Sequence, residues 1–259
     1  MKPLVSVITP TFNSQEFLKQ TIESIVHQSY KNWELILVDD ASSDDTLNII
    51  NKYVSGNTNI RFIKNKANSG AGVARNKGIL DAKGGFIAFL DADDLWKPNK
   101  LEVQINYMLK NNLDVSFSSY DLIDEEGNKL NKRVNALPEL TYTKLLRSNY
   151  LGNLTGMYSC KNLGKIQSPD LRKRQDWLLW LEAIKKSKKP AVGIQESLAY
   201  YRVRKNSISS NKFDLIKYNF LVYYKGLGFS LFKSAGYFLL FLYEHFFVKS
   251  RQISNLPRN

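Results

Sequence analysis

A predicted buried strand that ends in three carboxylates is the part of this chain best suited to chemistry. Residues 86–90 are apolar, and Asp91, Asp93 and Asp94 follow them within four positions. Carboxylates this close repel one another and lose hydration on burial, so a cation or several hydrogen-bond donors must compensate. Oxygen ligands of this kind suit Mg²⁺ or Mn²⁺, and such an ion commonly carries a diphosphate. We therefore expect a divalent metal at this cluster.

A structural alternative applies to the last of these carboxylates. Pro98 and an apolar run at helical spacing follow the cluster, so Asp93 or Asp94 could cap the next helix. Capping would explain one carboxylate but not all three. For Asp94 both interpretations stay open.

The composition fits a folded protein of one large domain, with or without an appendage. Of its 259 residues, 43% are hydrophobic, which is enough for a substantial core. Its single cysteine, Cys160, excludes an internal disulfide, and His27 and His245 lie too far apart in sequence to indicate a zinc site. Residues 5–8 are already strand-like, so no secretory signal pattern is recognised. We expect a cytoplasmic protein.

Positive charge and aromatic residues are concentrated after residue 200. Residues 200–259 hold ten Lys or Arg against two acids, and 15 of the 28 Phe and Tyr residues. The aromatics stand in apolar runs such as 237–243, which suits a membrane surface better than a nucleic acid. That run is too short, and Lys233 too close, for a membrane-spanning helix. A pair of helices packed on the core is the alternative.

Strand and helix patterns alternate through the first 120 residues. Short apolar strands are predicted at 5–9, 35–38, 60–63, 86–90 and 115–117. Helices are predicted between them, the first with Asn13 and Glu16 as a capping pair and the second around Ile50. This alternation indicates an α/β fold with a mainly parallel, doubly wound sheet.

The second half of the chain has a weaker pattern. A turn is predicted at 125–128, helices at 142–147 and 171–186, and strands at 191–194 and 198–202. The basic, aromatic tail follows residue 209. No internal repeat or low-complexity linker separates these parts.

Aspartates from two predicted strands should meet at one edge of the sheet. Ligands of such sheets bind beyond the carboxyl ends of the strands, where residues 39, 40, 91 and 93 fall. No glycine-rich turn follows the first strand and no Gly-Lys-Ser/Thr loop occurs, so the dinucleotide and P-loop phosphate cradles are both absent. A metal and a basic side chain must then hold the phosphates, and Arg75, early in a predicted helix, is our candidate. The alternative is that Arg75 is a surface residue of that helix.

Four segments, in order, resemble the family 2 glycosyltransferases, which have the nucleotide-diphospho-sugar transferase (GT-A) fold. They are VSVITPTFN at 5–13, VDDASSDDT at 38–46, ARNKG at 74–78 and FLDADD at 89–94. The resemblance extends over residues 3–210. It implies a nucleotide-sugar-binding half at 1–120 and an acceptor-binding, catalytic-base half of the same domain at 121–211. Residues 212–259 are then a C-terminal amphipathic helical extension.

The resemblance implies a role for each residue of the donor site. Pro10 and Phe12 match the loop that packs against the base and ribose. Asp40 matches the carboxylate that accepts the imino hydrogen of uracil or thymine, which favours a UDP-sugar. Asp91 and Asp93 match the family's Asp-x-Asp (DxD) motif, with Asp93 contacting Mn²⁺ or Mg²⁺ and Asp91 contacting the ribose or a metal-bound water.

Two later positions match residues that act on the acceptor and the diphosphate. Asp176, in the run RQDWLLW, matches the base that deprotonates the acceptor hydroxyl. Many relatives have a Glu-Asp pair here, whereas this chain has Gln175, so only Asp176 carries over. The alternative is a first-turn acid that the helix dipole favours. Arg204 stands where many relatives carry a histidine, and because a guanidinium cannot ligate a metal we expect it to contact the diphosphate.

The motifs around Asp176 and Arg204 look most like those of cell-envelope polysaccharide glycosyltransferases of the teichuronic acid type. The resemblance implies metal-dependent transfer, with inversion, from a nucleotide diphosphate sugar to a hydroxyl of a lipid-linked oligosaccharide. Asp176 would take the proton while the metal neutralises the leaving diphosphate. The tail would meet anionic head groups on the inner face of the cytoplasmic membrane, as in a peripheral membrane protein.

Two other classes of function remain open, and no nucleic-acid partner is expected. They are a sugar nucleotidyltransferase and a non-catalytic nucleotide-binding protein at the membrane. A nucleotidyltransferase should have a glycine-rich basic first loop, which residues 9–13 are not. The sequence does not identify the sugar, the acceptor, the linkage or the oligomeric state.

Overall fold

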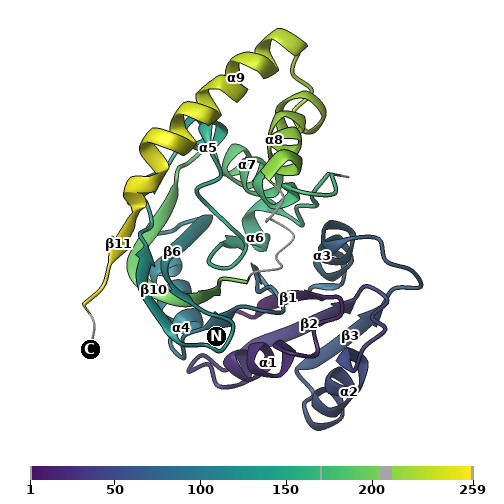
Figure 1. The fold of residues 1–259 in the computed structure, drawn as a ribbon. Helices are drawn as coiled ribbons and strands as arrows, with labels where there is room; N and C mark the ends of the chain where they lie inside the picture. The colour runs from purple at the N-terminus through teal and green to yellow at the C-terminus, as the bar shows by residue number, and fades with distance from the viewer. Residues whose placement is uncertain (1, 170, 205–211, 258–259) are drawn as a thin grey trace.

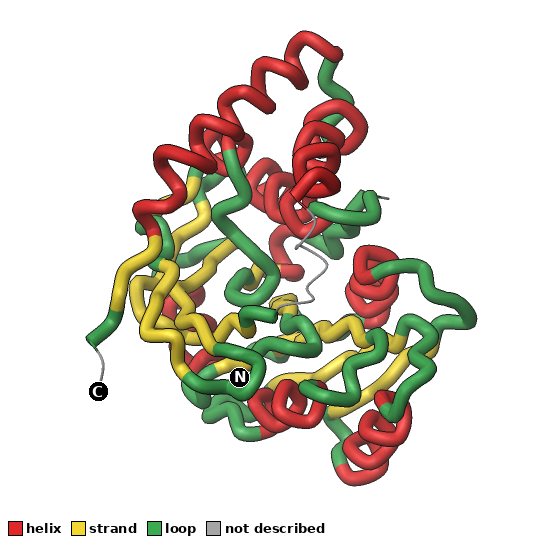
Figure 2. The backbone as a smooth tube through the Cα atoms, in the orientation of Figure 1, coloured by secondary structure: helices red, strands yellow, loops and turns green. Residues whose placement is uncertain are grey.

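A large mixed sheet with helices against both of its faces forms the frame of the protein (Figures 1 and 2). The computed structural model describes residues 2–169, 171–204 and 212–257, and within them the sheet has eleven strands. Eight of these follow one another in the order β11-β7-β6-β9-β4-β1-β2-β3, while β5, β8 and β10 pair beside this path.

The first half of the chain forms the parallel part of the sheet. Its strands, in the spatial order β3-β2-β1-β4, are β1 (Val5–Thr11), β2 (Trp33–Asp39), β3 (Ile60–Lys64) and β4 (Phe86–Phe89). Its helices are α1 (Leu18–Val26), α2 (Thr46–Gly56), α3 (Ala71–Asp81) and α4 (Lys100–Lys110). Strands β1, β2 and β4 are buried along their whole length, as continuous apolar runs in a covered parallel sheet must be. The predicted doubly wound arrangement is confirmed in this half.

Two predicted helix caps are wrong. Helix α1 begins after Phe17 without a side-chain cap, and Asn13, at φ 45°, instead accepts a hydrogen bond from the backbone N–H of Ser43. The chain first crosses to the loop after β2 and only then turns into the helix. The three carboxylates lead into the short strand β5 (Leu95–Trp96), and Asn99 occupies the N-cap of α4. Neither Asp93 nor Asp94 therefore caps that helix.

The second half adds antiparallel strands to the parallel sheet. Its strands are β6 (Val115–Ile123), β7 (Lys129–Val134), β8 (Glu139–Leu140), β9 (Met157–Ser159) and β10 (Ala191–Arg202). Strand β9 lies between β4 and β6 and is antiparallel to both, which makes the sheet mixed. The two strands predicted at 191–194 and 198–202 are one strand, β10, whose register against β6 shifts between Ile194 and Ala199. A bulged strand has two apolar segments out of phase, so it looks like two strands in the sequence.

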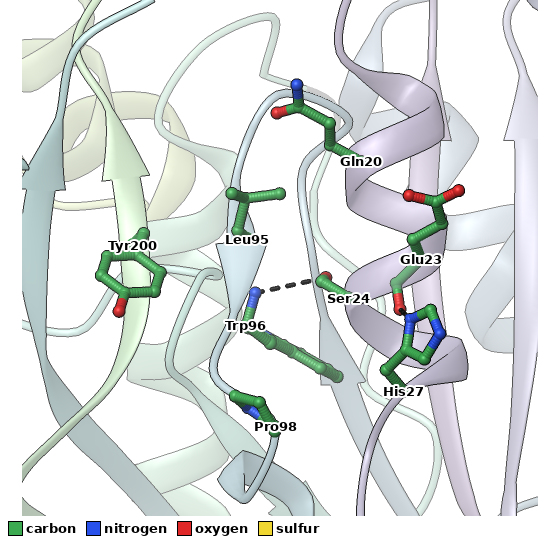
Figure 3. A pocket seen from close by; sticks show the side chains of 8 residues that line it. All are labelled: Gln20, Glu23, Ser24, His27, Leu95, Trp96, Pro98 and Tyr200. Carbon is green, nitrogen blue, oxygen red and sulfur yellow. Dashed lines mark hydrogen bonds between the residues drawn. The ribbon is translucent and has the colours of Figure 1, made fainter. Parts of the chain in front are cut away.

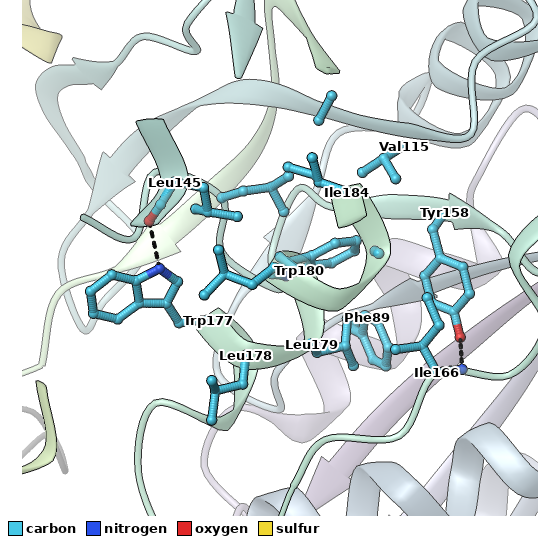
Figure 4. Close-up of a cluster of buried hydrophobic side chains, with 14 of the residues drawn as sticks. Phe89, Val115, Leu145, Tyr158, Ile166, Trp177, Leu178, Leu179, Trp180 and Ile184 are labelled. Atoms are coloured by element: carbon cyan, nitrogen blue, oxygen red, sulfur yellow. Dashed lines mark hydrogen bonds between the residues drawn. The ribbon is translucent and has the colours of Figure 1, made fainter. Parts of the chain in front are cut away.

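Three helices of the second half surround the aromatic core, which Figure 4 shows in close-up. They are α5 (Tyr142–Arg147), α6 (Cys160–Leu163) and α7 (Gln175–Ser187). Trp180 meets Phe89 of β4 edge-on, with ring centroids 5.9 Å apart, and Trp177 donates to the carbonyl oxygen of Leu145 over 2.8 Å. A Cβ added at Gly156 would lie 2.2 Å from the Trp180 ring, so only glycine fits there. This packing fixes the first turns of α7 against the sheet.

The C-terminal part of the chain is helical and then returns to the sheet. It comprises α8 (Lys212–Leu221), the π-helical turn η1 (Val222–Gly226), α9 (Leu231–Tyr243), the π-helical turn η2 (Glu244–Val248), the 3-10 turn η3 (Lys249–Gln252) and β11 (Ile253–Asn255). Figure 1 shows α9 running along the outside of α5 and α7 toward β11, which pairs antiparallel with β7. The helices were predicted and the strand was not. Within the described residues, no helix has the length and apolarity needed to cross a bilayer.

Candidate active site

The carboxylates predicted to share a site lie at the carboxyl edge of the parallel strands. Thr11 of β1 is level with Asp39 of β2 in the parallel register, and the acidic segment follows β4, which is the other neighbour of β1. A Cβ added at Gly72 of α3 would lie 3.0 Å from Cγ of Gln175, so the first turns of α3 and α7 touch. This contact brings α7, which carries the predicted catalytic base Asp176, next to α3, which carries Arg75.

Arg75 is buried and bound to the acidic segment. Its Nη2 donates to Oδ1 of Asp91 over 2.5 Å, and its Nε has no partner among the described residues. The surface-residue alternative is therefore wrong for Arg75. The guanidinium partly neutralises Asp91, and its Nε–H remains available to donate a hydrogen bond.

Asp93 is held by the other predicted arginine. Nη1 of Arg204 donates to Oδ2 of Asp93 over 3.0 Å, and the Arg204 guanidinium lies 5.1 Å from the ring centroid of Phe17. Burial and the charge of Asp91 raise the pKa of Asp93, and Arg204 opposes that rise. Arg204 thus reaches the carboxylate cluster itself.

Asp94 is the most deeply buried of the three carboxylates. It accepts a hydrogen bond from the backbone N–H of Arg202 over 2.9 Å. Burial, followed by the charge of Asp93, raises the pKa of Asp94 well above its usual value. The Arg202 guanidinium is also buried and donates to the carbonyl oxygen of Asp93 and to Oε1 of Gln20. Arg202, which we did not predict, thus fastens the acidic segment to β10 and α1.

The acidic segment has the chemistry of a cation site. Within the described part of the chain, no three His, Cys, Asp or Glu side chains form a metal-binding group. A hard divalent ion that takes its remaining ligands from phosphate and water needs fewer protein ligands than that. Burial is the main cause of the raised pKa values of Asp93 and Asp94, and repulsion between the carboxylates adds to it. Carboxylates in this state fit such an ion.

The residues expected around the nucleotide base differ in how exposed they are. Phe12 is 48% exposed, so its ring is free to stack, whereas Pro10 is buried inside β1. Asp40 is 2% exposed, and its carboxylate accepts from the Asn65 side chain over 2.7 Å and from the backbone N–H groups of Ser69 and Gly70. Asp40 therefore holds the turn that starts α3. A nucleotide base that bound Asp40 would have to share its carboxylate with those donors.

Asp176 stands in the first turn of α7. The helix begins at Gln175 rather than at 171, because Arg174 adopts a left-handed backbone conformation with φ 67°. The side-chain amide of Asn149 donates to Oδ2 of Asp176 over 2.9 Å. Asn149 precedes the short strand β9 in an irregular segment, where no pattern marks it as a site residue. Asp176 is thus oriented by a partner that we did not predict.

Two hollows in the surface lie outside this constellation. Figure 3 shows one of about 290 Å³ between α1 and β5, lined by residues that include Glu23, Trp96 and Tyr200. Another of about 500 Å³ lies beside α7, with Lys165 and Lys185 in its wall. Neither is lined by a predicted site residue.

Comparison with solved structures identifies the fold. A crystal structure of TarS residues 1–349 from S. aureus in complex with UDP-GlcNAc aligns with a TM-score of 0.73 at 23% identity, covering 93% of this chain and 72% of that one. The mannosyltransferase PcManGT of Pyrobaculum calidifontis, in complex with GDP-Man and Mn²⁺, aligns with a TM-score of 0.70 at 15% identity, covering 97% and 72%. The protein has the GT-A fold.

Comparison of sequences adds nearer relatives. The glycosyltransferase TuaG of Bacillus subtilis (strain 168), named for teichuronic acid biosynthesis, is 43% identical over 222 residues, which are 86% of this chain and 88% of TuaG. WfgD of Escherichia coli, named as a UDP-Glc:alpha-D-GlcNAc-diphosphoundecaprenol beta-1,3-glucosyltransferase, is 37% identical over 83% of each chain. The model of Glycosyl transferase family 2 matches residues 6–168, from β1 through the acidic segment to β9 and α6. Sequence, fold and the carboxylate edge agree, and the chain belongs to glycosyl transferase family 2.

Proposed function

We propose that the protein transfers a sugar from a UDP-sugar to a hydroxyl of a lipid-linked acceptor during cell-envelope polysaccharide synthesis, with inversion at the anomeric carbon. The names of WfgD and TuaG support this acceptor class and this pathway class. The complex of TarS with UDP-GlcNAc supports a uridine nucleotide. One observation carries the proposal: a cluster of mutually repelling carboxylates lies on one side of the α3–α7 contact, and Asp176, a carboxylate oriented by the Asn149 side chain, lies on the other.

The donor is held at the carboxyl edge of β1, β2 and β4. The exposed ring of Phe12 stacks on the uracil beside Pro10, and Asp40 supports the base and the turn that leads to α3. Asp91 contacts the ribose or a metal-bound water. Arg75 offers its free Nε–H to the diphosphate.

Metal dependence is the second part of the donor proposal. Asp93, with Asp91, would hold Mn²⁺ or Mg²⁺, and the PcManGT complex with GDP-Man and Mn²⁺ supports a divalent ion in this fold. When bound, the ion supplies positive charge that stabilises the leaving diphosphate. Arg204, which donates to Asp93 here, would contact the diphosphate when a nucleotide sugar is bound.

Asp176 acts as the general base. The Asn149 amide holds one carboxylate oxygen, so the other is free to accept the proton of the acceptor hydroxyl. The deprotonated oxygen attacks the anomeric carbon from the face opposite the diphosphate, which inverts the configuration. Because the leaving group needs no proton, one catalytic carboxylate is enough.

The C-terminal helices place the protein on the cytoplasmic face of the membrane. One side of α9 and η1 packs on the core through Tyr223 and Phe241, which are buried. The other side exposes large apolar residues, and these form the apolar face: Leu231, Phe232, Leu239, Leu240, Tyr243, Phe246 and Phe247. Phe232 is 90% exposed. An apolar surface of this kind beside exposed lysines suits the head-group region of an anionic bilayer.

A panel of nucleotide sugars tests the function. Each donor is incubated with Mn²⁺ or Mg²⁺ and a lipid-diphosphate-linked sugar, and released nucleoside diphosphate and product are measured. We expect UDP release with at least one UDP-sugar, and metal-dependent thermal stabilisation by UDP. Stabilisation by UDP that is the same without metal, with no transfer or slow hydrolysis of any donor, would instead indicate a non-catalytic nucleotide-binding protein.

A further inference from the structure

The C-terminal segment forms one wall of the presumed acceptor site. Glu244 of η2 is buried and bound by the side chains of Lys144 and Tyr150. Nζ of Lys249, at the start of η3, donates to the carbonyl oxygen of Asn149, whose side chain holds Asp176. The tail therefore reaches the predicted base through a single intervening residue.

Two cations in this wall have no carboxylate partner among the described residues. Lys144 of α5 forms an ion pair with Glu244, but no described carboxylate lies within ion-pairing distance of Lys249 or Arg174. Nε of Arg174 is buried without a partner among the described residues. The Lys249 ammonium has three N–H donors, and the Asn149 carbonyl takes one of them. These two side chains keep donors for a ligand.

Burial is the main influence on the pKa values of both Lys249 and Arg174. Burial and the nearby charge of Arg174 lower the pKa of Lys249 to about 8, and Asp176 opposes this shift. Burial also lowers the pKa of Arg174. Two half-buried cations that repel each other favour an anion that joins them. Arg174 also has a left-handed backbone conformation, a form of strain found at functional sites.

The location of these cations relates them to the acceptor. Arg174 stands two residues before Asp176, and Lys249 contacts Asn149, whose side chain holds Asp176, so an anion bound by both cations would lie near the hydroxyl that Asp176 deprotonates. Phe246 and Phe247 of the apolar face stand just before Lys249 in the chain. A sugar diphosphate on a lipid carrier presents these features in this order: a reacting hydroxyl, a diphosphate and an apolar chain.

We propose that Arg174 and Lys249 form a subsite for the diphosphate that joins the acceptor sugar to its lipid carrier. The proposal rests on the proposed function for the class of acceptor. Lys249 is also a positioning residue, because its bond to Asn149 supports the amide that orients Asp176. The C-terminal extension is on this view part of the acceptor site as well as a membrane contact.

Binding of farnesyl diphosphate to the enzyme saturated with UDP and Mg²⁺ tests the subsite, with farnesol as the uncharged comparison. UDP fills the donor site, so a difference between the two probes reports a second diphosphate site. We expect Lys249→Met and Arg174→Gln each to weaken farnesyl diphosphate binding roughly tenfold or more, the effect of losing a charged hydrogen bond. Binding of farnesol and of UDP should not change.

Control variants separate the subsite from general effects. Lys249→Arg should retain most of the binding, and Lys185→Met, which removes an exposed lysine from the same helix as Asp176, should retain all of it. Intact UDP binding shows that each variant is folded. If Lys249→Met did not fold, Arg174→Gln would decide alone.

Two results would overturn the proposal. One is wild-type enzyme that binds farnesyl diphosphate no more tightly than farnesol. The other is a loss of binding to phosphatidylglycerol vesicles in Lys249→Met that matches its loss for farnesyl diphosphate, since Lys249 would then serve the membrane surface. Failure of every nucleotide sugar as a donor would refute the proposed function without changing these binding measurements.

Discussion

The two sides of the α3–α7 contact differ in the charged groups that gather there. On the donor side, three carboxylates lie with three guanidinium groups, those of Arg75, Arg202 and Arg204, and burial with mutual repulsion raises the pKa values of Asp93 and Asp94. On the acceptor side, the half-buried Lys249 and Arg174 stand near the single carboxylate Asp176, and both their pKa values are lowered. The carboxylates of the donor side suit the proposed metal cation, and the cations of the acceptor side suit the proposed acceptor diphosphate.

This difference would let one protein receive two diphosphates at separate places. On the proposed mechanism, a diphosphate binds the donor side more tightly together with a cation, because the carboxylates repel it on its own, whereas the acceptor side attracts a diphosphate directly. The predictions below test this division, from the largest expected effect to the smallest.

Removing the base should abolish transfer and leave the donor side intact. We expect Asp176→Asn to lower the transfer rate by about 10²- to 10⁴-fold, the usual contribution of a general base. UDP binding, measured by thermal shift with metal, should equal that of the wild type. Glu182→Gln, which changes a carboxylate later in the same helix, is the control and should keep its activity. A fully active Asp176→Asn enzyme would remove Asp176 from the mechanism.

Asp93→Asn should weaken UDP binding only when metal is present. The variant loses a charged ligand, so metal-dependent UDP affinity should fall by at least roughly tenfold, while the weak binding without metal stays the same. Titration of UDP with and without Mn²⁺ measures both values. An equal loss in the two conditions would mean that Asp93 contacts the nucleotide directly.

Breaking the Arg75–Asp91 pair should destabilise the fold as well as the donor site. Arg75→Met leaves the partly exposed carboxylate of Asp91 without its guanidinium, and we expect the free energy of unfolding to fall by about 1–3 kcal/mol in urea. Arg61→Met breaks the pair with Glu34 and Asp81 outside the site and serves as the control. Only Arg75→Met should also weaken UDP binding.

The affinity for the acceptor diphosphate should depend on pH through Lys249. Its protonated form binds the anion, so farnesyl diphosphate affinity should fall as the pH rises through about 8. Other charged groups near it are Arg174, Asp176 and His245. Stability should change in the opposite direction, because between pH 8 and the usual value of 10.5 the unfolded chain binds more protons than the folded one. Lys249→Arg should shift the fall in affinity to higher pH, and an unchanged profile would exclude Lys249 as its cause.

The smallest expected effect concerns the apolar face. Phe232→Ser removes its most exposed aromatic ring, and co-sedimentation with anionic vesicles at moderate salt should fall roughly three- to tenfold. Leu80→Ser, at an exposed position on α3, should bind as the wild type does. Failure of the wild-type protein to co-sediment would point instead to an interface between protein copies.

The donor half could be predicted because its signals are local. Strands β1, β2 and β4 are mostly apolar runs, and the carboxyl edge follows from the parallel topology, so the placement of residues 39, 40, 91 and 93 at that edge needed no distant information. The burial of Arg75 was not accessible in this way. Its sequence position is compatible with either face of α3, and only the position of Asp91 decides between them.

The acceptor half depends on contacts between distant residues that leave no local signal. Asn149 and Lys249 are 100 residues apart, and neither belongs to a periodic segment. The same holds for β11, whose three residues form a strand only because β7 offers an open edge. Helix α7 is also shorter than predicted, because Arg174 has a left-handed backbone conformation. A helical pattern in the sequence does not show where the first turn fails to form.

Strand β11 also has a consequence for the order in which the protein folds. Residues 253–255 leave the ribosome about 120 residues after β7, which they pair with. Until then the outer edge of β7 is open and exposed to pairing with other chains. The parallel half can fold early from its own contacts, while the wall beside Asp176 is completed only on arrival of the tail. Newly made protein should therefore bind nucleotide before it can process an acceptor.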